Sequence, residues 1–276
     1  NENYGEDLGF SDNIPSSFSL EKYALVSHQG NSSSCVGFAV ARGAMSIIYN
    51  MINNLEYDEM IVNTFDPFYI YSSLRNPSEK DCGTSGCDCG TRIVHALDLV
   101  KNYGCKKTFV NPSLKCSAFL SKTNLRSLVY KTGMYQIDGH RDLLKYYKTR
   151  TGDWERYVNI KKIKQAIAHR NPIIAGIYIT EDFHKLKTTN QPYSSNFKKS
   201  GAHAITIVGY NDFKYGGAFR ILNSYGYDWG DNGFFWMSYK EFSERVGAAY
   251  IILNDDWNSW KKKVNGEKYY KGFNKS

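Results

Sequence analysis

The sequence predicts an α+β protein with a helical amino-terminal lobe, a carboxy-terminal lobe built as an antiparallel β-sheet or barrel, and a cleft between them. The first half of the chain carries apolar residues at every third or fourth position, which is the period of an amphipathic helix. Beyond Pro172, short β-branched runs are separated by glycine-bearing turns, which is typical of strands. Helices followed by strands, rather than helices alternating with strands, favour this fold class over a parallel α/β sheet.

Three helices are predicted from capping residues and apolar spacing. The first begins at or next to Cys35, because the preceding serines are natural N-caps and apolar residues follow at helical spacing, at Val36, Val40, Ala44, Ile47 and Met51. The second covers residues 91–103 and stops at Gly104. The third covers residues 159–169 and ends before Asn171-Pro172.

Strands are predicted in the second half of the chain, where β-branched residues cluster between turns. Five runs have this character, at residues 173–179, 204–208, 218–222, 234–237 and 249–253. We therefore expect an N-terminal extension, a two-lobed domain and a basic tail, over residues 1–13, 14–255 and 256–276. Within the domain, the helical lobe is expected over about 20–125 and the β lobe over about 126–255.

Composition and charge exclude several classes of protein. The chain has 276 residues, of which 42% are hydrophobic, and this suits one large domain or two lobes that share an interface. It contains no run of eighteen apolar residues, so we expect no membrane span. Half of the net charge of +8 lies in the tail at residues 256–276. A solvated terminus is the expected interpretation, and no motif indicates a nucleic-acid partner.

Cys35 is the candidate nucleophile. A helix N-terminus carries partial positive charge, which stabilises a thiolate and lowers the pKa of the thiol. The alternative is an inert structural cysteine. Gln29 lies six residues upstream in a polar loop, and its side-chain amide and the backbone N–H of Cys35 could together hold one carbonyl oxygen. Such a pair of donors forms an oxyanion hole.

His203 and Asn223 are the candidate base and its partner. His203 enters an apolar run that is predicted as a strand, and Asn223 ends the next predicted strand. An asparagine can hold one imidazole nitrogen and leave the other free for a thiol proton. The alternative for His203 is a core histidine with a structural hydrogen bond. The other five histidines are interpreted as surface or structural residues, namely His28, His95, His140, His169 and His184.

Six segments, in chain order, together resemble one known family. Three of them carry the candidate catalytic residues, at residues 29–39, 201–210 and 223–234, and three are supporting pieces, at residues 14–18, 86–90 and 165–173. The pattern resembles the papain-like cysteine peptidase family, in which a cysteine precedes a distant histidine and asparagine. The resemblance covers roughly residues 14–255, and residues 36–39 and 66–71 look more like the bacterial members.

The resemblance implies a papain-like two-lobe fold and an endopeptidase that forms a thioester with its substrate. Cys35 would be the nucleophile, His203 the base and acid, Asn223 the residue that orients His203, and Gln29 part of the oxyanion hole. Substrate-binding roles would fall to Gly90, Ala202 and Tyr225. The family needs no cofactor and no metal. The implied partners are protein or peptide substrates and an inhibitory pro-segment, and the implied protein is a secreted or otherwise extracytoplasmic monomer.

The chain departs from the family pattern at three sites near the candidate catalytic residues. Val36 and Tyr225 each stand where the family has an aromatic residue or tryptophan, which affects how the His203–Asn223 hydrogen bond is shielded. Ser32 stands where the family has a cysteine. The separation of 168 residues between Cys35 and His203 exceeds the family range, so we expect an insertion between residues 116 and 160.

The remaining five cysteines are predicted to form at most two local disulfides in one lobe and to leave at least one free thiol. The preferred pair is Cys105 with Cys116, and the second joins Cys82 to Cys89 or Cys87. A zinc site is the alternative, although the spacing differs from the usual paired ligands. Two alternatives to peptide hydrolysis stay open. One is acyl transfer or peptide ligation with the same residues, and the other is a non-catalytic binding protein on the same fold.

Overall fold

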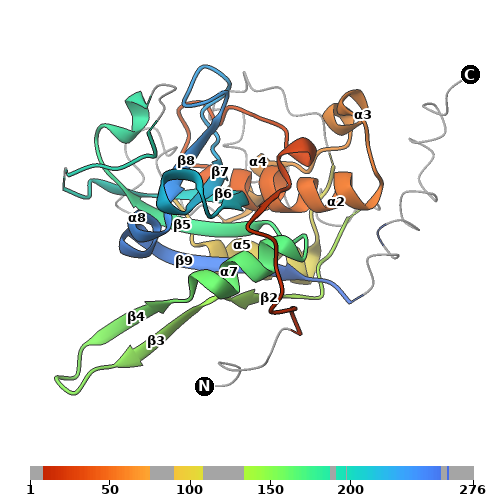
Figure 1. The fold of residues 1–276 in the computed structure, drawn as a ribbon. Coiled ribbons are helices and arrows are strands. Elements are labelled where there is room, and N and C mark those ends of the chain that lie inside the picture. The colour runs from red at the N-terminus through yellow and green to blue at the C-terminus, as the bar shows by residue number, and fades with distance from the viewer. Residues whose placement is uncertain are drawn as a thin grey trace, which may run out of the picture.

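The computed structural model describes residues 9–74, 90–107, 134–186, 191–196, 198–255 and 260. In this part of the chain a seven-stranded antiparallel sheet lies between a long helix on one face and shorter helices on the other, and a two-stranded hairpin projects from the body (Figure 1). The α+β prediction is confirmed. Most helices precede residue 104 and most strands follow residue 172, which is the predicted order, although α7 (Ile160–Ala168) and α8 (Tyr239–Arg245) lie further along the chain.

The sheet has the strand order β2-β9-β5-β6-β7-β8, and β1 pairs with β6 beside this path. Every neighbouring pair is antiparallel. Its strands are β1 (Ser17–Ser19), β2 (Gly139–Asp142), β5 (Ile173–Ile179), β6 (Gly201–Asn211), β7 (Ala218–Leu222), β8 (Phe234–Ser238) and β9 (Val246–Leu253). The prediction of β5 and β7 is confirmed to the residue, whereas β6 and β9 begin three residues earlier than predicted.

The long helix consists of three consecutive segments, α1 (Cys35–Gly37), the π-helical η2 (Phe38–Met45) and α2 (Ser46–Ile52). The other helices are α3 (Tyr57–Val62), α4 (Pro67–Leu74), α5 (Ile93–Tyr103), α7 (Ile160–Ala168) and α8 (Tyr239–Arg245), with short 3-10 turns η1 (Glu21–Tyr23), η4 (Phe183–Lys185) and η5 (Lys214–Gly216). The predicted starts near Cys35, Thr91 and Asn159 are confirmed to within two residues. Helix α5 ends at Gly104, whose φ of 80° suits glycine.

The long helix packs directly on strand β6. A side chain at Gly43 would place its Cβ 2.0 Å from the Thr206 hydroxyl oxygen, so only glycine allows this approach. The Thr206 hydroxyl donates a hydrogen bond of 3.1 Å to the carbonyl oxygen of Ala39. These contacts fix the first residues of the helix against the beginning of β6, and so bring Cys35 and the residues around His203 to one place.

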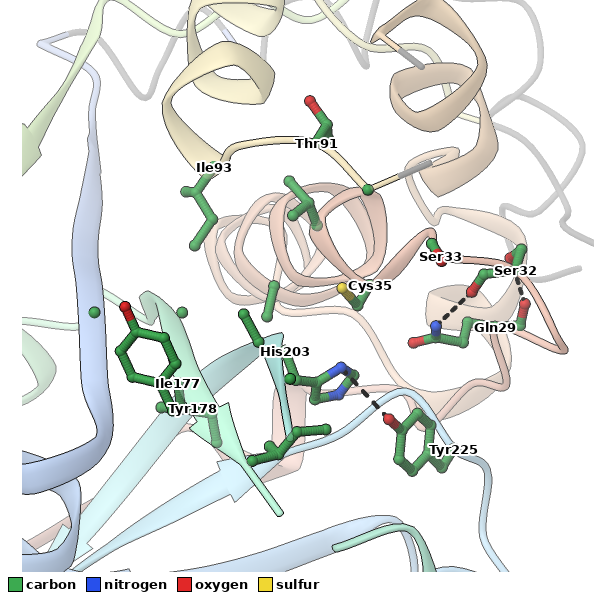
Figure 2. Close-up of a pocket in the computed structure, with 18 of the residues that line it drawn as sticks. Gln29, Ser32, Ser33, Cys35, Thr91, Ile93, Ile177, Tyr178, His203 and Tyr225 are labelled. Atoms are coloured by element: carbon green, nitrogen blue, oxygen red, sulfur yellow. Dashed lines mark hydrogen bonds between the residues drawn. The ribbon is translucent and has the colours of Figure 1, made fainter. Parts of the chain in front are cut away.

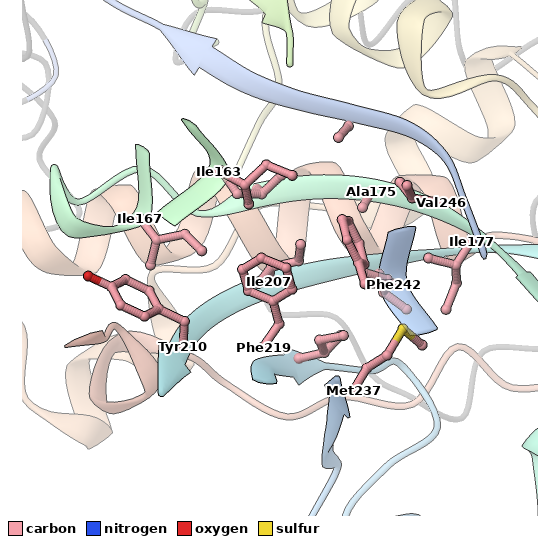
Figure 3. Close-up of a cluster of buried hydrophobic side chains, with 14 of the residues drawn as sticks. Ile163, Ile167, Ala175, Ile177, Ile207, Tyr210, Phe219, Met237, Phe242 and Val246 are labelled. Carbon is pink, nitrogen blue, oxygen red and sulfur yellow. The ribbon is translucent and has the colours of Figure 1, made fainter. Parts of the chain in front are cut away.

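Two hydrophobic cores use opposite faces of the sheet. On the first face, side chains of α7, α8 and the strands interlock (Figure 3), among them Ile163, Ile167, Ala175, Ile207, Phe219 and Phe242. On the second face the long helix and α5 pack on residues such as Ile174 and Ala204. Because successive residues of a strand point to opposite faces, Ile174 and Ala175 serve different cores.

The predicted lobe boundaries are crossed at both ends of the domain. Ser17–Ser19 belongs to the sheet of the β lobe, because it pairs with β6. Trp260, which was predicted to lie in a solvated tail, is fully buried against Phe65 of the helical lobe and Tyr135. The rest of the predicted basic tail lies outside the described residues.

The run Cys35–Ile52 is long and apolar enough to cross a membrane, although the sequence was expected to contain no such segment. Most of it is buried inside the protein, where it forms the central helix between α4, α5 and the sheet. A helix that is surrounded by protein needs apolar residues all round. Its composition is therefore explained by its place in the core.

A hairpin occupies part of the interval in which an insertion was predicted. It consists of β3 (Leu144–Lys148) and β4 (Trp154–Val158), which pair with each other and with no other strand among the described residues. Strands β1 to β4 were not predicted, because they contain no run of β-branched residues. Helices α3, α4 and α8 were not predicted either, and none of them is longer than eight residues. Short elements carry too few residues for a period to stand out.

Candidate active site

A cleft of about 1750 Å³ lies between the start of the long helix and the start of β6 (Figure 2). Six of the seven sequence-predicted site residues line it, namely Gln29, Cys35, Gly90, Ala202, His203 and Tyr225. The seventh, Asn223, is buried behind His203. The fold therefore brings together every residue that the sequence nominated.

Cys35 is the first residue of the long helix, as predicted, and is partly exposed to the cleft. The helix begins with a hydrogen bond from the backbone N–H of Phe38 to the carbonyl of Ser34, and the Ser34 side chain makes no capping bond. Burial raises the pKa of the Cys35 thiol, and this outweighs hydrogen bonding to the backbone of Ala204 and Val36. The backbone N–H groups of Cys35 and Val36 at the helix start lower this pKa, as expected of a helix terminus, but burial outweighs them and the net shift is upward.

His203 is held by Asn223 through one ring nitrogen. The distance from His203 Nε2 to Asn223 Oδ1 is 2.7 Å, and the same oxygen accepts a hydrogen bond of 2.8 Å from the backbone N–H of Ser224. Because Asn223 Oδ1 can only accept, the neutral ring carries its proton on Nε2. The lone pair of Nδ1 is then available on the other side of the ring, where Figure 2 shows Cys35 and Tyr225.

Burial acts on both ionisable groups of the pair in the same sense. It lowers the pKa of His203 to about 4, against the hydrogen bond that His203 Nε2–H donates to Asn223, and a smaller lowering comes from His184. Because Cys35 is shifted upward and His203 downward, an isolated charge on either group is disfavoured. The pair keeps one proton over a wide pH range, and transfer of that proton from sulfur to Nδ1 leaves the net charge unchanged.

The side chain of Gln29 is fixed at both ends of its amide. Its Oε1 accepts a hydrogen bond of 2.6 Å from the Ser224 hydroxyl, and its Nε2 donates one of 2.7 Å to the Ser32 carbonyl. The amide has a second N–H, for which the described residues offer no acceptor. Since Gln29 is buried and lines the cleft, this N–H is available to an oxygen atom of a ligand.

Hydroxyl groups stabilise the loop at which the family has a cysteine. The Ser32 hydroxyl donates to the Gln29 carbonyl at 2.8 Å and lies 2.6 Å from the Ser34 hydroxyl. Both serines are buried. A local polar network therefore holds the loop before Cys35 in place.

Cys105 is a free, fully buried thiol, so the predicted disulfide with Cys116 is wrong. Its sulfur lies 3.6 Å from the carbonyl oxygens of Asp66 and Lys106. Burial raises the pKa of Cys105 well above the usual range, which keeps it protonated as a donor. The pairing of Cys82 with Cys87 or Cys89, and Cys116 itself, lie outside the described residues. Among the described residues, no three His, Cys, Asp or Glu side chains are grouped to hold a metal.

An aromatic stack covers one side of His203. The ring of Tyr225 lies 4.9 Å from the ring of His203, and the ring of His184 is stacked on Tyr225 at 5.3 Å. Phe183 and Trp229 contact the same group. The ring of Tyr225, which stands where the family has tryptophan, therefore provides an apolar cover for His203. His184 was interpreted as a surface residue, and its place in the stack carries no signal in the sequence.

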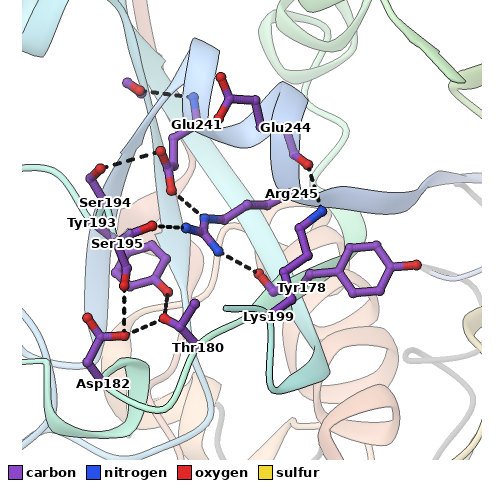
Figure 4. A network of polar contacts seen from close by, with 11 residues as sticks. Tyr178, Thr180, Asp182, Tyr193, Ser194, Ser195, Lys199, Glu241, Glu244 and Arg245 are labelled. Atoms are coloured by element: carbon purple, nitrogen blue, oxygen red, sulfur yellow. Dashed lines mark hydrogen bonds and ion pairs between the residues drawn. The ribbon is translucent and has the colours of Figure 1, made fainter. Parts of the chain in front are cut away.

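A polar network fixes the cleft wall at the junction of α8 and β9 (Figure 4). The buried Arg245 pairs with Glu241 and donates hydrogen bonds to the carbonyl oxygens of Ser195 and Tyr178, at 2.6 and 3.5 Å. Tyr178 lines the cleft, and Lys199 lies over its ring at 4.7 Å. Arg245 therefore joins three segments that are distant in sequence.

The family model described as papain family cysteine protease matches residues 73–253. This range contains His203 and Asn223 and begins after Cys35. Curated relatives include a cathepsin B-like cysteine proteinase 3 of Ostertagia ostertagi, 33% identical over 29% of this chain and 45% of that protein. An uncharacterized peptidase C1-like protein of Acanthamoeba polyphaga mimivirus is 36% identical over 35% of this chain and 32% of that protein. The chain spans less than half the length of the curated relatives it matches.

Solved structures share the fold at low sequence identity. The digestive procathepsin L 3 of Tenebrio molitor larval midgut matches with a TM-score of 0.57 and 18% identity, over 87% of this chain and 70% of that chain. Xylellain, a cysteine protease from Xylella fastidiosa, matches with a TM-score of 0.57 and 19% identity, over 88% of each chain. Bacterial character is not confirmed, since the curated relatives are from nematodes and a virus.

Proposed function

Because the chain belongs to the papain family of cysteine proteases, we propose that it is an endopeptidase that hydrolyses peptide bonds through a thioester on Cys35. The observation that carries the proposal is the contact of 2.7 Å between His203 Nε2 and Asn223 Oδ1. It leaves Nδ1 as the free base in the cleft that Cys35 lines.

The reaction follows from this protonation state. Nδ1 of His203 takes the thiol proton while the sulfur of Cys35 attacks the carbonyl carbon of the substrate. His203 then returns the proton to the leaving amine, and the C–N bond breaks to give a thioester. Water attacks the thioester with His203 again as the base, and the thiol is regenerated with release of the carboxylic acid.

Charge that develops on the carbonyl oxygen is balanced by two donors, the free amide N–H of Gln29 and the backbone N–H of Cys35. The Ser224 and Ser32 contacts hold the Gln29 amide in place before the reaction, and preorganised donors are the effective ones. Gly90 and Ala202, which both line the cleft, supply backbone groups to an extended substrate.

The partners and location follow from family membership. Substrates are proteins or peptides, and no cofactor enters the reaction. An inhibitory pro-segment fits the same cleft, since two solved structures with this fold are proforms. A secreted or otherwise extracytoplasmic monomer fits the family. Closeness to its bacterial members rests on residues 36–39 and 66–71, with xylellain as a fold-level parallel.

The test is covalent labelling with a thiol-directed peptidyl epoxide, followed by peptide mapping with mass spectrometry. We expect a single adduct on Cys35, loss of hydrolysis in step with labelling, and no hydrolysis by the Cys35→Ala variant, which keeps the fold. Hydrolysis by the Cys35→Ala variant would contradict the proposed mechanism. Product analysis with added amine nucleophiles separates hydrolysis from transfer, and absence of both reactions in the unlabelled wild type would indicate a binding protein.

A further inference from the structure

The hairpin β3–β4 is held against the cleft wall. The Tyr146 hydroxyl donates a hydrogen bond of 2.9 Å to the carbonyl oxygen of Gly247, and the Arg156 side chain donates one of 3.1 Å to the carbonyl oxygen of Ser243. Gly247 lines the cleft, beside the ring of Tyr178. The base of the hairpin is therefore continuous with one end of the site.

The outer part of the hairpin is ordered by its own hydrogen bonds. The backbone N–H of Thr149 donates to the Asp153 carbonyl at 2.7 Å, and the Thr151 hydroxyl donates to the Asp153 carboxylate at 2.8 Å. On the adjoining strands the Tyr147 hydroxyl donates to the Glu155 carboxylate at 2.6 Å. Both carboxylates of the hairpin are thus engaged by neighbouring hydroxyls. The projecting arm seen in Figure 1 has a defined turn.

The register places a cation and an aromatic ring side by side on the face that adjoins the cleft. Tyr146 is opposite Arg156, and Lys148 is opposite Trp154. Residues that are opposite each other, or two apart on one strand, share a face of the hairpin. Tyr146, Lys148 and Trp154 therefore form a continuous strip on this face, which begins where Tyr146 contacts Gly247.

This end of the strip lacks internal partners. Trp154 is 72% exposed, the highest value for a tryptophan among the described residues. Within the described part of the chain, Lys148 and Arg150 form no ion pair. An exposed indole costs hydration free energy and contributes nothing to a core. A cation next to an aromatic ring is a combination that suits recognition of another molecule.

We propose that the face formed by Tyr146, Lys148 and Trp154, with Arg150 at the turn, is an exosite for an acidic stretch of the polypeptide substrate. The proposal rests on the proposed function, because the cleft that the strip prolongs is the one assigned to a peptide. The unpaired cations select carboxylate side chains, and Trp154 offers a flat surface for apolar neighbours. Among the charged residues that line the cleft, Arg92 and Lys185 have the same sign as these cations and Asp228 has the opposite sign.

The test compares two substrates that share one cleavable core peptide. One is the core alone, and the other carries about ten additional residues rich in Glu and Asp, which span up to about 35 Å when extended. The extension is placed on the amino side in one peptide and on the carboxyl side in another. We expect at least one extended peptide to show a kcat/KM about tenfold above the core peptide at low salt, and this advantage to shrink as salt is added.

The variants are Lys148→Glu, Trp154→Ala and their combination. Each should remove most of the tenfold advantage and leave kcat/KM of the core peptide within about twofold of wild type. The matched controls are Lys22→Glu and Phe213→Ala, which change an exposed lysine and an exposed phenylalanine outside the cleft. They should retain the full advantage.

Three results would overturn the exosite. One is equal kcat/KM for core and extended peptides in the wild type. Another is an advantage that the hairpin variants keep. The third is hairpin-dependent binding of the Cys35→Ala protein to anionic phospholipid vesicles without binding to the acidic peptide, which would assign the strip to a membrane. If the wild type does not hydrolyse the core peptide at all, the result counts against the proposed function rather than against the exosite.

Discussion

At the scale of single residues, the amide of Gln29 shows how the site is built before any substrate binds. Ser224, which is 195 positions away in the sequence, fixes its oxygen, and Ser32 fixes one of its N–H bonds. The second N–H of the Gln29 amide has no acceptor among the described residues and is available to a ligand in the cleft. An oxyanion donor that does not need to reorganise contributes to the transition state rather than to substrate binding.

Gln29→Ala should therefore lower kcat by about 10²–10³ with little change in KM, since removal of one oxyanion donor has this effect. The Ser224→Ala variant keeps the Gln29 amide N–H donor but removes the hydrogen bond to Gln29 Oε1. We therefore expect a smaller loss of kcat. Steady-state kinetics on one peptide substrate measures both. A change confined to KM would reassign Gln29 to substrate binding.

Tyr225 also acts as a single residue, through its ring and its hydroxyl separately. The ring covers His203 at 4.9 Å, whereas the hydroxyl lies 3.5 Å from Nδ1, the nitrogen that the reaction needs. Tyr225→Phe keeps the ring and removes a competitor for Nδ1, so we expect unchanged or higher kcat. Tyr225→Ala removes a ring contact worth about 1 kcal/mol, and kcat should fall roughly tenfold or more as water reaches the His203–Asn223 bond. Equal losses in both variants would show that the hydroxyl, not the ring, is what matters.

At the scale of secondary-structure elements, Arg245 determines how α8, β5 and the segment around Ser195 meet. Its guanidinium group is buried and has a carboxylate partner and two carbonyl acceptors. Lys199 reaches the same wall from the outside, where its amine donates to the Glu244 carbonyl at 3.3 Å. The buried and the exposed cation therefore offer a comparison within one wall of the cleft.

Arg245→Met should lower the free energy of unfolding by about 3–5 kcal/mol, because it leaves the Glu241 carboxylate buried without its partner. The double variant Arg245→Met with Glu241→Leu should recover part of this loss. Lys199→Met changes an exposed contact and should cost less than about 1 kcal/mol. Urea unfolding monitored by fluorescence measures all three, and similar values for Arg245→Met and Lys199→Met would contradict the role of the network.

At the scale of the whole molecule, the buried Cys35–His203 pair couples folding to pH. Between pH 6.5 and about 4 the unfolded chain binds a proton at His203 and the native protein does not, because burial lowers this pKa to about 4. Stability therefore falls as pH decreases through this window, by up to about 3 kcal/mol. On the alkaline side, burial raises the pKa of Cys35, so the unfolded chain loses the thiol proton first and stability falls again as pH rises.

His203→Gln should remove the acid part of this dependence. We expect its unfolding free energy to change less than that of the wild type between pH 7 and pH 4, with the difference approaching about 3 kcal/mol. Urea titrations of both proteins at pH 7, 5 and 4 make the measurement. Parallel pH dependences would mean that His203 is not the group that burial holds neutral.

The sequence by itself determined the fold class, eight of the main elements and the set of residues that meet in the cleft. Apolar spacing marked the long helix, α5 and α7, and β-branched runs between turns marked β5 to β9. The segments around Gln29, Cys35, His203 and Asn223 carried the family pattern. These features are local or lie in short motifs, so they can be read without knowing which segments touch. The same reading missed α3, α4 and α8, which contribute too few residues to show a period.

Only the tertiary structure decided the charge state of the site and the contacts around it. The helix terminus at Cys35 is visible in the sequence, but the burial that outweighs it depends on residues distant in the chain that surround the thiol in the folded protein. The same holds for the free thiol of Cys105, the stacking of His184 on Tyr225, and the return of Trp260 to the helical lobe, where its indole N–H donates to the Gln136 carbonyl at 3.0 Å. Each of these depends on desolvation or contact between residues distant in the chain, which no local pattern encodes.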